Sequence, residues 1–242
     1  MRFTYQEWAE RLEAAGLTVT RNGNVVNPRD GYTIGFVTFK QWSFKEPYIY
    51  EMTECRLYEC AGHRHFMTRR FDRLAGGKKL HYQSLCGIAH YDFNMPGAYS
   101  YEQALNVIKR LGLGYDALEE MYRRAAFNIC ARNQDDHAKN IGFLMDKRGV
   151  WTLAPAFDMT YAYNPQGTWT GMHQMTFNGK RSGFKLDDFK AVAKFAGLKQ
   201  GRYKKILAEV EDAVMQWKKL AKQNGVPIRI ARAIAGVHEF IL

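Results

Sequence analysis

The sequence has few cysteines and no long apolar run, and both shortages narrow the classes of protein that it can encode. Its 242 residues include four cysteines, at positions 55, 60, 86 and 130, and no Cys-x-x-Cys pair. This spacing argues against a structural zinc site, and a chain that can bury a sizeable core has little need of disulfides. No stretch approaches about 18 uninterrupted apolar residues, the length of a membrane-spanning helix. We therefore expect reduced thiols, no signal peptide, no membrane association and a cytoplasmic location.

Acidic residues are also scarce relative to basic ones. The chain carries 35 Lys and Arg residues against 24 Asp and Glu residues, which gives a net charge of +11. Residues 181–242 hold 13 of the basic residues and 6 of the acidic ones, without a long run of like charges. The balance favours an anionic partner, and its spread along the chain is typical of a basic helical surface and not of a disordered tail.

The hydrophobic pattern predicts an α+β protein with a small mixed N-terminal lobe and a larger, mainly helical C-terminal lobe. In residues 1–50 we expect a helix-plus-strands unit, because a capping box at Thr4 begins a helical pattern and Asn22-Gly23 is a strong hairpin signal. The strands expected in this unit occupy residues 17–21, 25–27 and 32–39. Residues 51–242 form the second expected unit, the C-terminal lobe.

In the second unit the spacing of apolar residues predicts both hairpins and helices. The expected strands occupy residues 54–58, 65–70, 141–145 and 150–153. The expected helices occupy residues 101–110, 115–130, 186–196, 202–223 and 227–240. Ser100 is the expected N-cap of the first of these helices, and Met215 and Trp217 are expected to fill core positions of the fourth.

The richest polar segment is Asn133–Asn140, which reads Asn-Gln-Asp-Asp-His-Ala-Lys-Asn. Phosphoryl transfer needs a carboxylate to orient the attacking hydroxyl, and an amide oxygen with a second carboxylate to hold magnesium against the phosphates. Asp135 and Asn140 have the Asp-x-x-x-x-Asn spacing of protein-kinase catalytic loops, and Phe157-Asp158 follows the predicted hairpin. The hairpin leads the chain out and back, so we expect Asp158 to return beside Asn140 and share a metal ion. A polar capping loop is the alternative, but the combination of residues favours phosphoryl transfer.

The same motif resembles a known family. Asn-x-Asp-x-His-x-Lys-Asn followed by Leu-x-Pro-x-Phe-Asp is similar to the HipA-like toxin kinases, the serine/threonine kinases of bacterial toxin–antitoxin pairs. The resemblance extends from Met52 to the C-terminus. Other segments that share it are His65–Arg73, Ser84, Ala98–Glu102, Phe127-Asn128 and Met175–Arg181.

The resemblance implies ATP and Mg²⁺ as cofactors and a role for each residue of the motif. Asp135 is the implied catalytic base that positions the substrate hydroxyl, and Asn140 and Asp158 are the implied magnesium ligands. His137 and Lys139 lie inside the implied catalytic loop, and we expect one of them near the phosphates.

Three further positions are implied to bind the nucleotide. Arg69 and Phe71 belong to a segment that resembles the hinge strand whose backbone meets adenine, and Gln83 matches a glutamine that lines the nucleotide pocket. Asp136 has a different expected role: we expect it to brace the loop and not to act as a second base.

The resemblance also implies partners. The implied substrate is a serine or threonine of a protein, with an aminoacyl-tRNA synthetase as the target class. A chain of this kind would act as a toxin that inhibits translation and is neutralised by a HipB-like DNA-binding antitoxin. DNA contact belongs mostly to the antitoxin in this family, so we expect this chain to meet DNA only indirectly.

One part of the family pattern is absent from the sequence, namely the glycine-rich phosphate loop and the strand lysine paired with a glutamate. Lys40 and Lys45 lie at or after the third expected strand, where Glu46 or Glu51 could pair with one of them. Two interpretations stay open. The chain is either a minimal kinase, whose missing lobe is replaced by residues 1–50 or supplied by a separate chain, or an impaired pseudokinase that acts by partner or nucleic-acid binding. A solvated helix face explains the lysines of the C-terminal helices without any partner.

Overall fold

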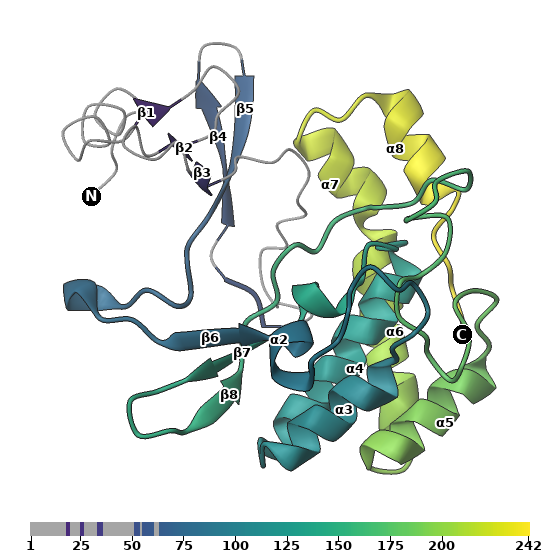
Figure 1. Cartoon of the computed structure of the whole chain (residues 1–242). Coiled ribbons are helices and arrows are strands. Elements are labelled where there is room, and N and C mark those ends of the chain that lie inside the picture. Colours follow the sequence, from purple (N-terminus) through teal and green to yellow (C-terminus); the bar gives the residue numbers. More distant parts are fainter. Residues whose placement is uncertain (1–17, 20–24, 27–32, 36–50, 54, 61–62) are drawn as a thin grey trace. The chain divides into compact units, whose positions relative to one another are not determined.

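The structure is a computed structural model, and its two compact units are described separately. One unit comprises residues 1–43 and 54–69, and the other comprises residues 44–53 and 70–242. The residues that the structure describes are 18–19, 25–26, 33–35, 51–53, 55–60 and 63–242 (Figure 1). The helix predicted at the N-terminus, the Asn22-Gly23 turn, Lys40, Lys45 and Glu46 lie outside the described residues. The division predicted at residue 50 stays a prediction.

The first unit contains two antiparallel sheets. Strands were predicted for both, but the pair at 54–58 and 65–70 was predicted in the C-terminal lobe. β1 (Thr18–Val19), β2 (Val25–Val26) and β3 (Thr33–Gly35) pair in chain order. β4 (Cys55–Cys60) and β5 (His63–Thr68) form a separate hairpin. β5 begins and ends two residues before its predicted range and β4 ends two residues after its own, because strand ends carry weaker signals than strand centres.

The second unit has a three-stranded antiparallel sheet, and the polar loop Asn133–Asn140 leads directly into its central strand. β6 (His81–Ser84) pairs with β7 (Gly142–Met145), which pairs with β8 (Trp151–Leu153). The β7–β8 hairpin was predicted, whereas β6 and the short helix α2 (Leu85–Ala89) that follows it were not. Gly142 is required at the start of β7, because a Cβ atom at this position would overlap with the Tyr82 ring on β6.

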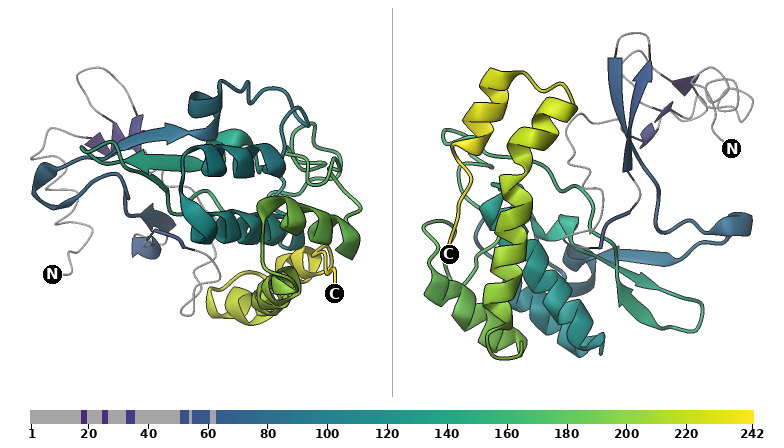
Figure 2. Two further views of the ribbon diagram at one scale, coloured as in Figure 1. Left: turned by 90° about the horizontal axis from the view of Figure 1, so that it is seen from below. Right: turned by 180° about the vertical axis from the view of Figure 1, so that it is seen from behind.

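A helical layer lies beside this sheet in both views of Figure 2. It contains α3 (Tyr101–Arg110), α4 (Gly114–Cys130), α5 (Leu186–Ala196) and α6 (Arg202–Met215). Helix α4 contacts α3, α5 and α6, and most of its residues from Met121 to Cys130 are buried. A helix that is enclosed in this way is a stable platform, since removing any part of its surface from this core exposes apolar area to water.

The start of α3 is fixed by a reciprocal capping box. The Ser100 side chain accepts a hydrogen bond from the Gln103 backbone N–H at 3.1 Å, and the Gln103 side chain accepts one from the Ser100 N–H at 2.7 Å. Helix α3 therefore begins at Tyr101 as predicted, and this cap holds the buried Tyr101 side chain in place.

An aromatic cluster fixes the long segment between β8 and α5 on the helical layer. The fully buried ring of Phe177 has its centroid 4.8 Å from that of Phe189 and within about 6 Å of the rings of Tyr101, Tyr122 and Phe184. Such pairs each stabilise the fold by about 0.5–1.5 kcal/mol beyond their buried area. The segment thus has a defined position although it contains little regular structure.

The last helices differ from the prediction. The helix predicted over 202–223 ends at Met215, and α7 (Trp217–Gln223) follows; α8 (Ile228–Ala235) is shorter than the predicted 227–240. At the break, the Gln216 N–H bonds to the carbonyl of Ala213. The Trp217 indole then donates to the Ala231 carbonyl at 2.8 Å, which ties α7 to α8. The predicted core position of Met215 is wrong, because its side chain is 59% exposed.

The α+β class is confirmed by these elements. Among the described residues, no helix combines the length and the apolar composition that crossing a membrane requires.

Candidate active site

The segment Asn133–Asn140 forms a loop that is fixed at both ends. It follows the C-terminus of α4, where the Asn133 N–H bonds to the Asn128 carbonyl at 2.9 Å. It ends in a single 3₁₀ turn, Ala138–Asn140, directly before β7. The Leu85 N–H of α2 then bonds to the Ile141 carbonyl at 2.8 Å. A buried helix and a central strand thus position the loop, as expected for a catalytic constellation on a rigid scaffold.

The structure brings Asp135, Asn140 and Asp158 together, as the sequence predicted. The Asn140 Nδ2 atom donates to the Asp135 carbonyl at 3.0 Å, and the Asn140 side chain also hydrogen-bonds to Asp158. Asp158 has a φ of 54°, in the left-handed region that aspartate and asparagine adopt more readily than most residues. This backbone conformation turns the chain after β8 so that the Asp158 carboxylate returns to the loop.

The electrostatics of Asp158 fit a cation site. Its side chain is exposed, yet the surrounding protein removes part of its hydration, and this desolvation together with the negative charge of Asp135 raises the pKa of the Asp158 carboxyl. The positive influence of His137 and the hydrogen bond from Asn140 oppose the rise without cancelling it. Two carboxylates that repel each other across an amide side chain would gain from a positive charge placed between them.

The ligand chemistry fits magnesium bound together with a nucleotide. Across the described residues, no three His, Cys, Asp or Glu side chains cluster closely enough to hold a metal ion by themselves. Magnesium at phosphoryl-transfer sites is usually held by one or two carboxylates plus substrate phosphates and water, so a full protein cage is not expected. The Asp158 carboxylate and the Asn140 Oδ1 atom are the groups that would hold it, because the Asn140 nitrogen is already used as a donor.

His137 and Lys139 follow Asp135 in the loop and share one aromatic neighbour, Phe93. The His137 Nε2 atom lies 3.7 Å from the Asp135 Oδ1 atom, and the imidazole ring lies 5.9 Å from the Phe93 ring. The Lys139 ammonium lies 3.8 Å from the centroid of the same Phe93 ring, a cation–π contact. Sequence reasoning missed Phe93, which belongs to the loop between α2 and α3 and carries no motif of its own.

The predicted nucleotide-binding residues occupy different positions. Phe71 forms an aromatic cluster with Tyr82 and Phe157, at centroid distances of 5.8 and 5.6 Å, and so packs beside the residue that precedes Asp158. Gln83 is half-buried on β6, and its side chain lies against Gly87 of α2. Arg69 is exposed and belongs to the first unit. Their contact with a nucleotide stays a prediction.

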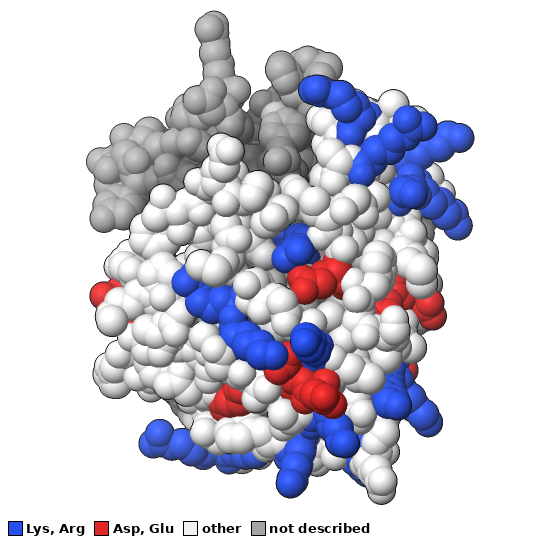
Figure 3. All heavy atoms as spheres, turned by 90° about the vertical axis from the view of Figure 1, so that its right-hand side faces the viewer, with Lys and Arg blue, Asp and Glu red and all other residues white. Residues whose placement is uncertain are grey.

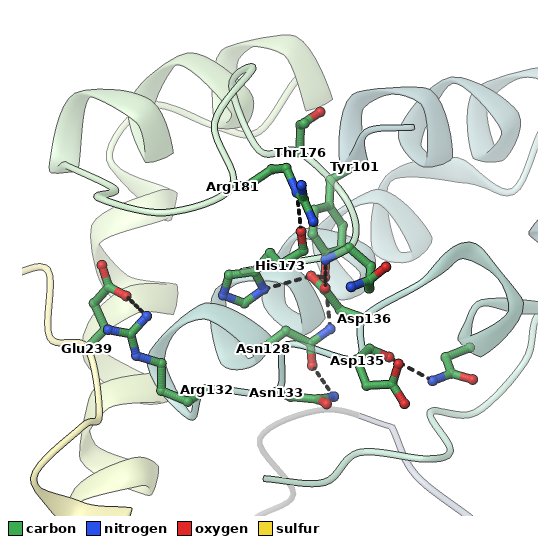
Figure 4. A network of polar contacts seen from close by, with 12 residues as sticks. Tyr101, Asn128, Arg132, Asn133, Asp135, Asp136, His173, Thr176, Arg181 and Glu239 are labelled. Atoms are coloured by element: carbon green, nitrogen blue, oxygen red, sulfur yellow. Dashed lines mark hydrogen bonds and ion pairs between the residues drawn. The ribbon is translucent and has the colours of Figure 1, made fainter. Parts of the chain in front are cut away.

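Asp136 braces the loop, as expected, and its partners form a buried network (Figure 4). Its carboxylate accepts hydrogen bonds from the Tyr101 hydroxyl at 2.7 Å and from the Gln174 backbone N–H at 2.7 Å. His173 Nδ1 lies 2.9 Å from the same carboxylate. Sequence reasoning missed His173, because an isolated histidine in a loop has no spacing that would reveal a partner 37 residues earlier.

The Asn-Gly-Lys-Arg segment that shares the family resemblance has a structural role here. The side chains of Asn178 and Lys180 both bond to the Asp188 carboxylate, each at 2.7 Å, at the start of α5. The Arg181 guanidinium donates to the His173 carbonyl at 2.6 Å. These residues hold their own segment against the helical layer, beside the loop that carries Asp135.

Comparisons with known proteins agree with this architecture. The family model of the HipA-like C-terminal domain matches residues 47–217. Among solved structures, the chain is similar to one in the Shewanella oneidensis MR-1 toxin–antitoxin complex of HipA, HipB and operator DNA, at 15% sequence identity and a TM-score of 0.53. The alignment covers 76% of this chain and 46% of that one, so the chain spans less than half the length of its match. At this identity the likeness shows the fold alone. A search of curated proteins finds no match.

Proposed function

Because the chain belongs to the family of the HipA-like C-terminal domain, we propose that it is a serine/threonine protein kinase that uses ATP and Mg²⁺. The observation that supports the proposal is that Asp135 and Asn140, which follow α4, lie close to Asp158, which follows β8. Repulsion by Asp135 helps to raise the pKa of Asp158. Phosphoryl transfer needs this set of groups and few others from the protein.

Each residue has a distinct task in the proposed reaction. Asp135, whose side chain is 44% exposed, would orient the substrate hydroxyl and receive its proton. Asp158 and Asn140 would hold magnesium, which supplies positive charge against the phosphate oxygens as charge develops on them. His137 would stay beside Asp135 and contribute positive charge when protonated, and Lys139 would reach the phosphates only by leaving the Phe93 ring.

The partners are also proposed by analogy with the family. The matched structure holds HipA together with HipB and operator DNA. We propose a HipB-like antitoxin as a partner of this chain, a protein substrate of the aminoacyl-tRNA synthetase class, contact with DNA only through the antitoxin, and a cytoplasmic location.

A catalytically impaired pseudokinase is the second candidate, and a specific observation favours it. The 242 residues of the sequence show no glycine-rich phosphate loop and no strand lysine paired with a glutamate. A separate chain that supplies this lobe would restore activity, whereas a pseudokinase would keep partner binding without phosphate transfer.

The test is direct. Purified protein is titrated with Mg²⁺-ATP by calorimetry and assayed for transfer of labelled phosphate to candidate substrates, with and without a supplied N-lobe. We expect binding and transfer, and loss of transfer in Asp135→Asn with the fold retained. Asp187→Asn, on the exposed side of α5, is the matched control and should transfer phosphate normally. Binding without transfer under all conditions would favour the pseudokinase, and absence of both would exclude the kinase proposal.

A further inference from the structure

The buried carboxylate of Asp136 joins three parts of the chain that are far apart in sequence (Figure 4). The Tyr101 hydroxyl comes from the first residue of α3, and His173 and the Gln174 N–H come from the segment after β8. The side chains of Asp136 and His173 are 0% and 1% exposed. Asp136 is therefore one point at which the loop is attached to the rest of the helical layer.

The chemistry of these contacts makes the attachment stiff. An ionised carboxylate can only accept hydrogen bonds, so beside an ionised Asp136 the His173 Nδ1 atom, 2.9 Å away, would act as the donor. Burial and the neighbouring Asp136 raise the pKa of the Tyr101 hydroxyl well above 10, so it stays protonated and remains a donor. A buried carboxylate without donors is strongly unfavourable, and any displacement of the loop that breaks these contacts meets that penalty.

A second set of contacts supports the same attachment from α4. The Asn128 Nδ2 atom donates to the Tyr101 hydroxyl at 2.9 Å, and the Asn133 Nδ2 atom donates to the Asn128 Oδ1 atom at 2.9 Å. Asn133 belongs to the loop itself, so the loop is tied to α4 and α3 in addition to its bond with His173.

His173 is itself held on both sides. Its backbone N–H and carbonyl pair with the Arg181 carbonyl at 3.2 Å and the Arg181 Nε atom at 2.6 Å. Its ring packs edge-on against the buried Phe184 ring at 5.5 Å. The imidazole is thus a fixed donor, and its position depends on the Asn178–Arg181 segment.

We propose that His173 is a positioning residue for phosphoryl transfer: by donating to Asp136 it fixes the backbone of the loop and thereby the position of the adjacent Asp135. This inference rests on the proposed kinase function. Asp135 and Asp136 are neighbours in one loop, and one is exposed while the other is buried. Fixing the buried carboxylate therefore constrains where the exposed one points. A displacement of about 1 Å at a reacting group can reduce the rate about 100-fold.

The experiment uses a matched pair of substitutions at one position in the full chain. His173→Asn keeps a side-chain N–H donor near the place of Nδ1, and His173→Leu has nearly the same size as asparagine without a donor. We expect kcat to fall at least about tenfold in the leucine variant, with KM for Mg²⁺-ATP unchanged, and to stay within about threefold of wild type in the asparagine variant. Equal loss of kcat in both variants, or a loss that follows only the folded fraction measured by circular dichroism, would overturn the proposal.

Hydrogen exchange gives a readout that needs no activity. In the leucine variant the amides of residues 133–140 and of Gln174 should exchange faster, and in the asparagine variant they should be protected as in wild type. If wild type transfers no phosphate, the proposed function fails, and the exchange pattern alone decides the positioning inference. Equal protection in all three proteins contradicts it. If His173→Leu does not fold, Tyr101→Phe removes another donor to the same carboxylate while keeping the ring, and the same predictions apply to it.

Discussion

Two adjacent carboxylates of the catalytic loop occupy opposite environments. Asp136 is buried, accepts hydrogen bonds from the Tyr101 hydroxyl and the Gln174 N–H, and lies 2.9 Å from His173 Nδ1. Asp135 is 44% exposed, and its negative charge helps to raise the Asp158 pKa. Residue type alone does not separate them, because their side chains are identical. Their roles follow from the donors around each one.

Substituting Asp158 with asparagine should separate stability from function. The pKa of Asp158 is raised in the folded state, so its favourable contribution to stability is present below the unfolded pKa and lost as the pH rises through the folded pKa. In metal-free protein, Asp158→Asn should therefore be more stable than wild type at pH 7, and the difference should disappear below about pH 4. Asparagine also tolerates the left-handed φ of this position.

Added Mg²⁺ should reverse the order of stability of wild type and Asp158→Asn. It should raise the melting temperature of wild type and of the Asp187→Asn control, but not that of Asp158→Asn, and phosphate transfer should fall at least about 100-fold in the last. Urea denaturation at pH 7 and below about pH 4 measures the free energies of unfolding, and thermal scans with and without Mg²⁺ measure the melting temperatures. An Asp158→Asn protein that is stabilised by Mg²⁺ as strongly as wild type would rule out Asp158 as a ligand.

Helix α4 is the element on which the site is built. Its C-terminal half is buried between α3, α5 and α6, and its end leads directly into the catalytic loop. On its more exposed side, Arg202 of α6 bonds to Glu119 through both ends of the guanidinium, with the Nε atom 2.9 Å from Oε2. Arg123 joins the same carboxylate at 3.6 Å. These ion pairs fix α6 against the platform.

The Arg202–Glu119 pair should make part of the stability depend on pH. The hydrogen bonds from Arg202 lower the pKa of Glu119, so this contribution is present above the unfolded pKa and is lost as the pH falls through the folded pKa. Arg202→Met should cost about 1 kcal/mol in the free energy of unfolding at pH 7, and its difference from wild type should shrink below about pH 4. Urea denaturation from pH 3 to 8 measures both. Lys204→Met, at an exposed position of the same helix, is the control, and an equal pH-independent cost in both variants would argue against the pair.

At the scale of the whole molecule, the positive charge is concentrated away from the catalytic motif. Residues 213–238 contain five Lys and Arg residues and no Asp or Glu. Figure 3 shows basic side chains gathered over α7 and α8 on one face. Within the described part of the chain, none of these five cations forms an ion pair. This surface would attract anions, whereas the acidic pair Asp135 and Asp158 would attract a cation.

The two charged regions should therefore be separable by mutation. Replacing Lys218, Lys219 and Lys222 together with glutamine should weaken retention on a heparin column and leave phosphate transfer unchanged, because all three are exposed and lie outside the catalytic loop. Asp158→Asn should lose phosphate transfer and keep its retention on heparin. If the chain binds nucleic acid directly, the triple variant should also lower the dependence of log K on log salt by about 0.9 for each lost phosphate contact. Loss of transfer in the triple variant would connect this surface to catalysis.

Local signals in the sequence predicted much of the second unit. The cap at Ser100, the start and end of α5, and the β7–β8 hairpin depend on neighbouring residues, and each lies at or close to its predicted place. The Asp135–Asn140 motif belongs to the same class, because its spacing is short and the β7–β8 hairpin, with the turn at Asp158, returns the chain to it. The sequence did not predict the break of the long helix at Gln216. The hydrogen bond from Trp217 to Ala231 at this break joins two helices, and a contact between helices has no local signal in the sequence.

What the sequence determined by itself was which polar residues form the candidate site, namely Asp135, Asn140 and Asp158, because these residues lie close together along the chain. Only the tertiary structure decided that β6 pairs with β7, that Tyr101 and His173 meet at Asp136, and that Arg181 supports His173. The physical reason is that such contacts have no local signature: a buried carboxylate requires donors, but any distant tyrosine, histidine or backbone amide can supply them once the core brings it there.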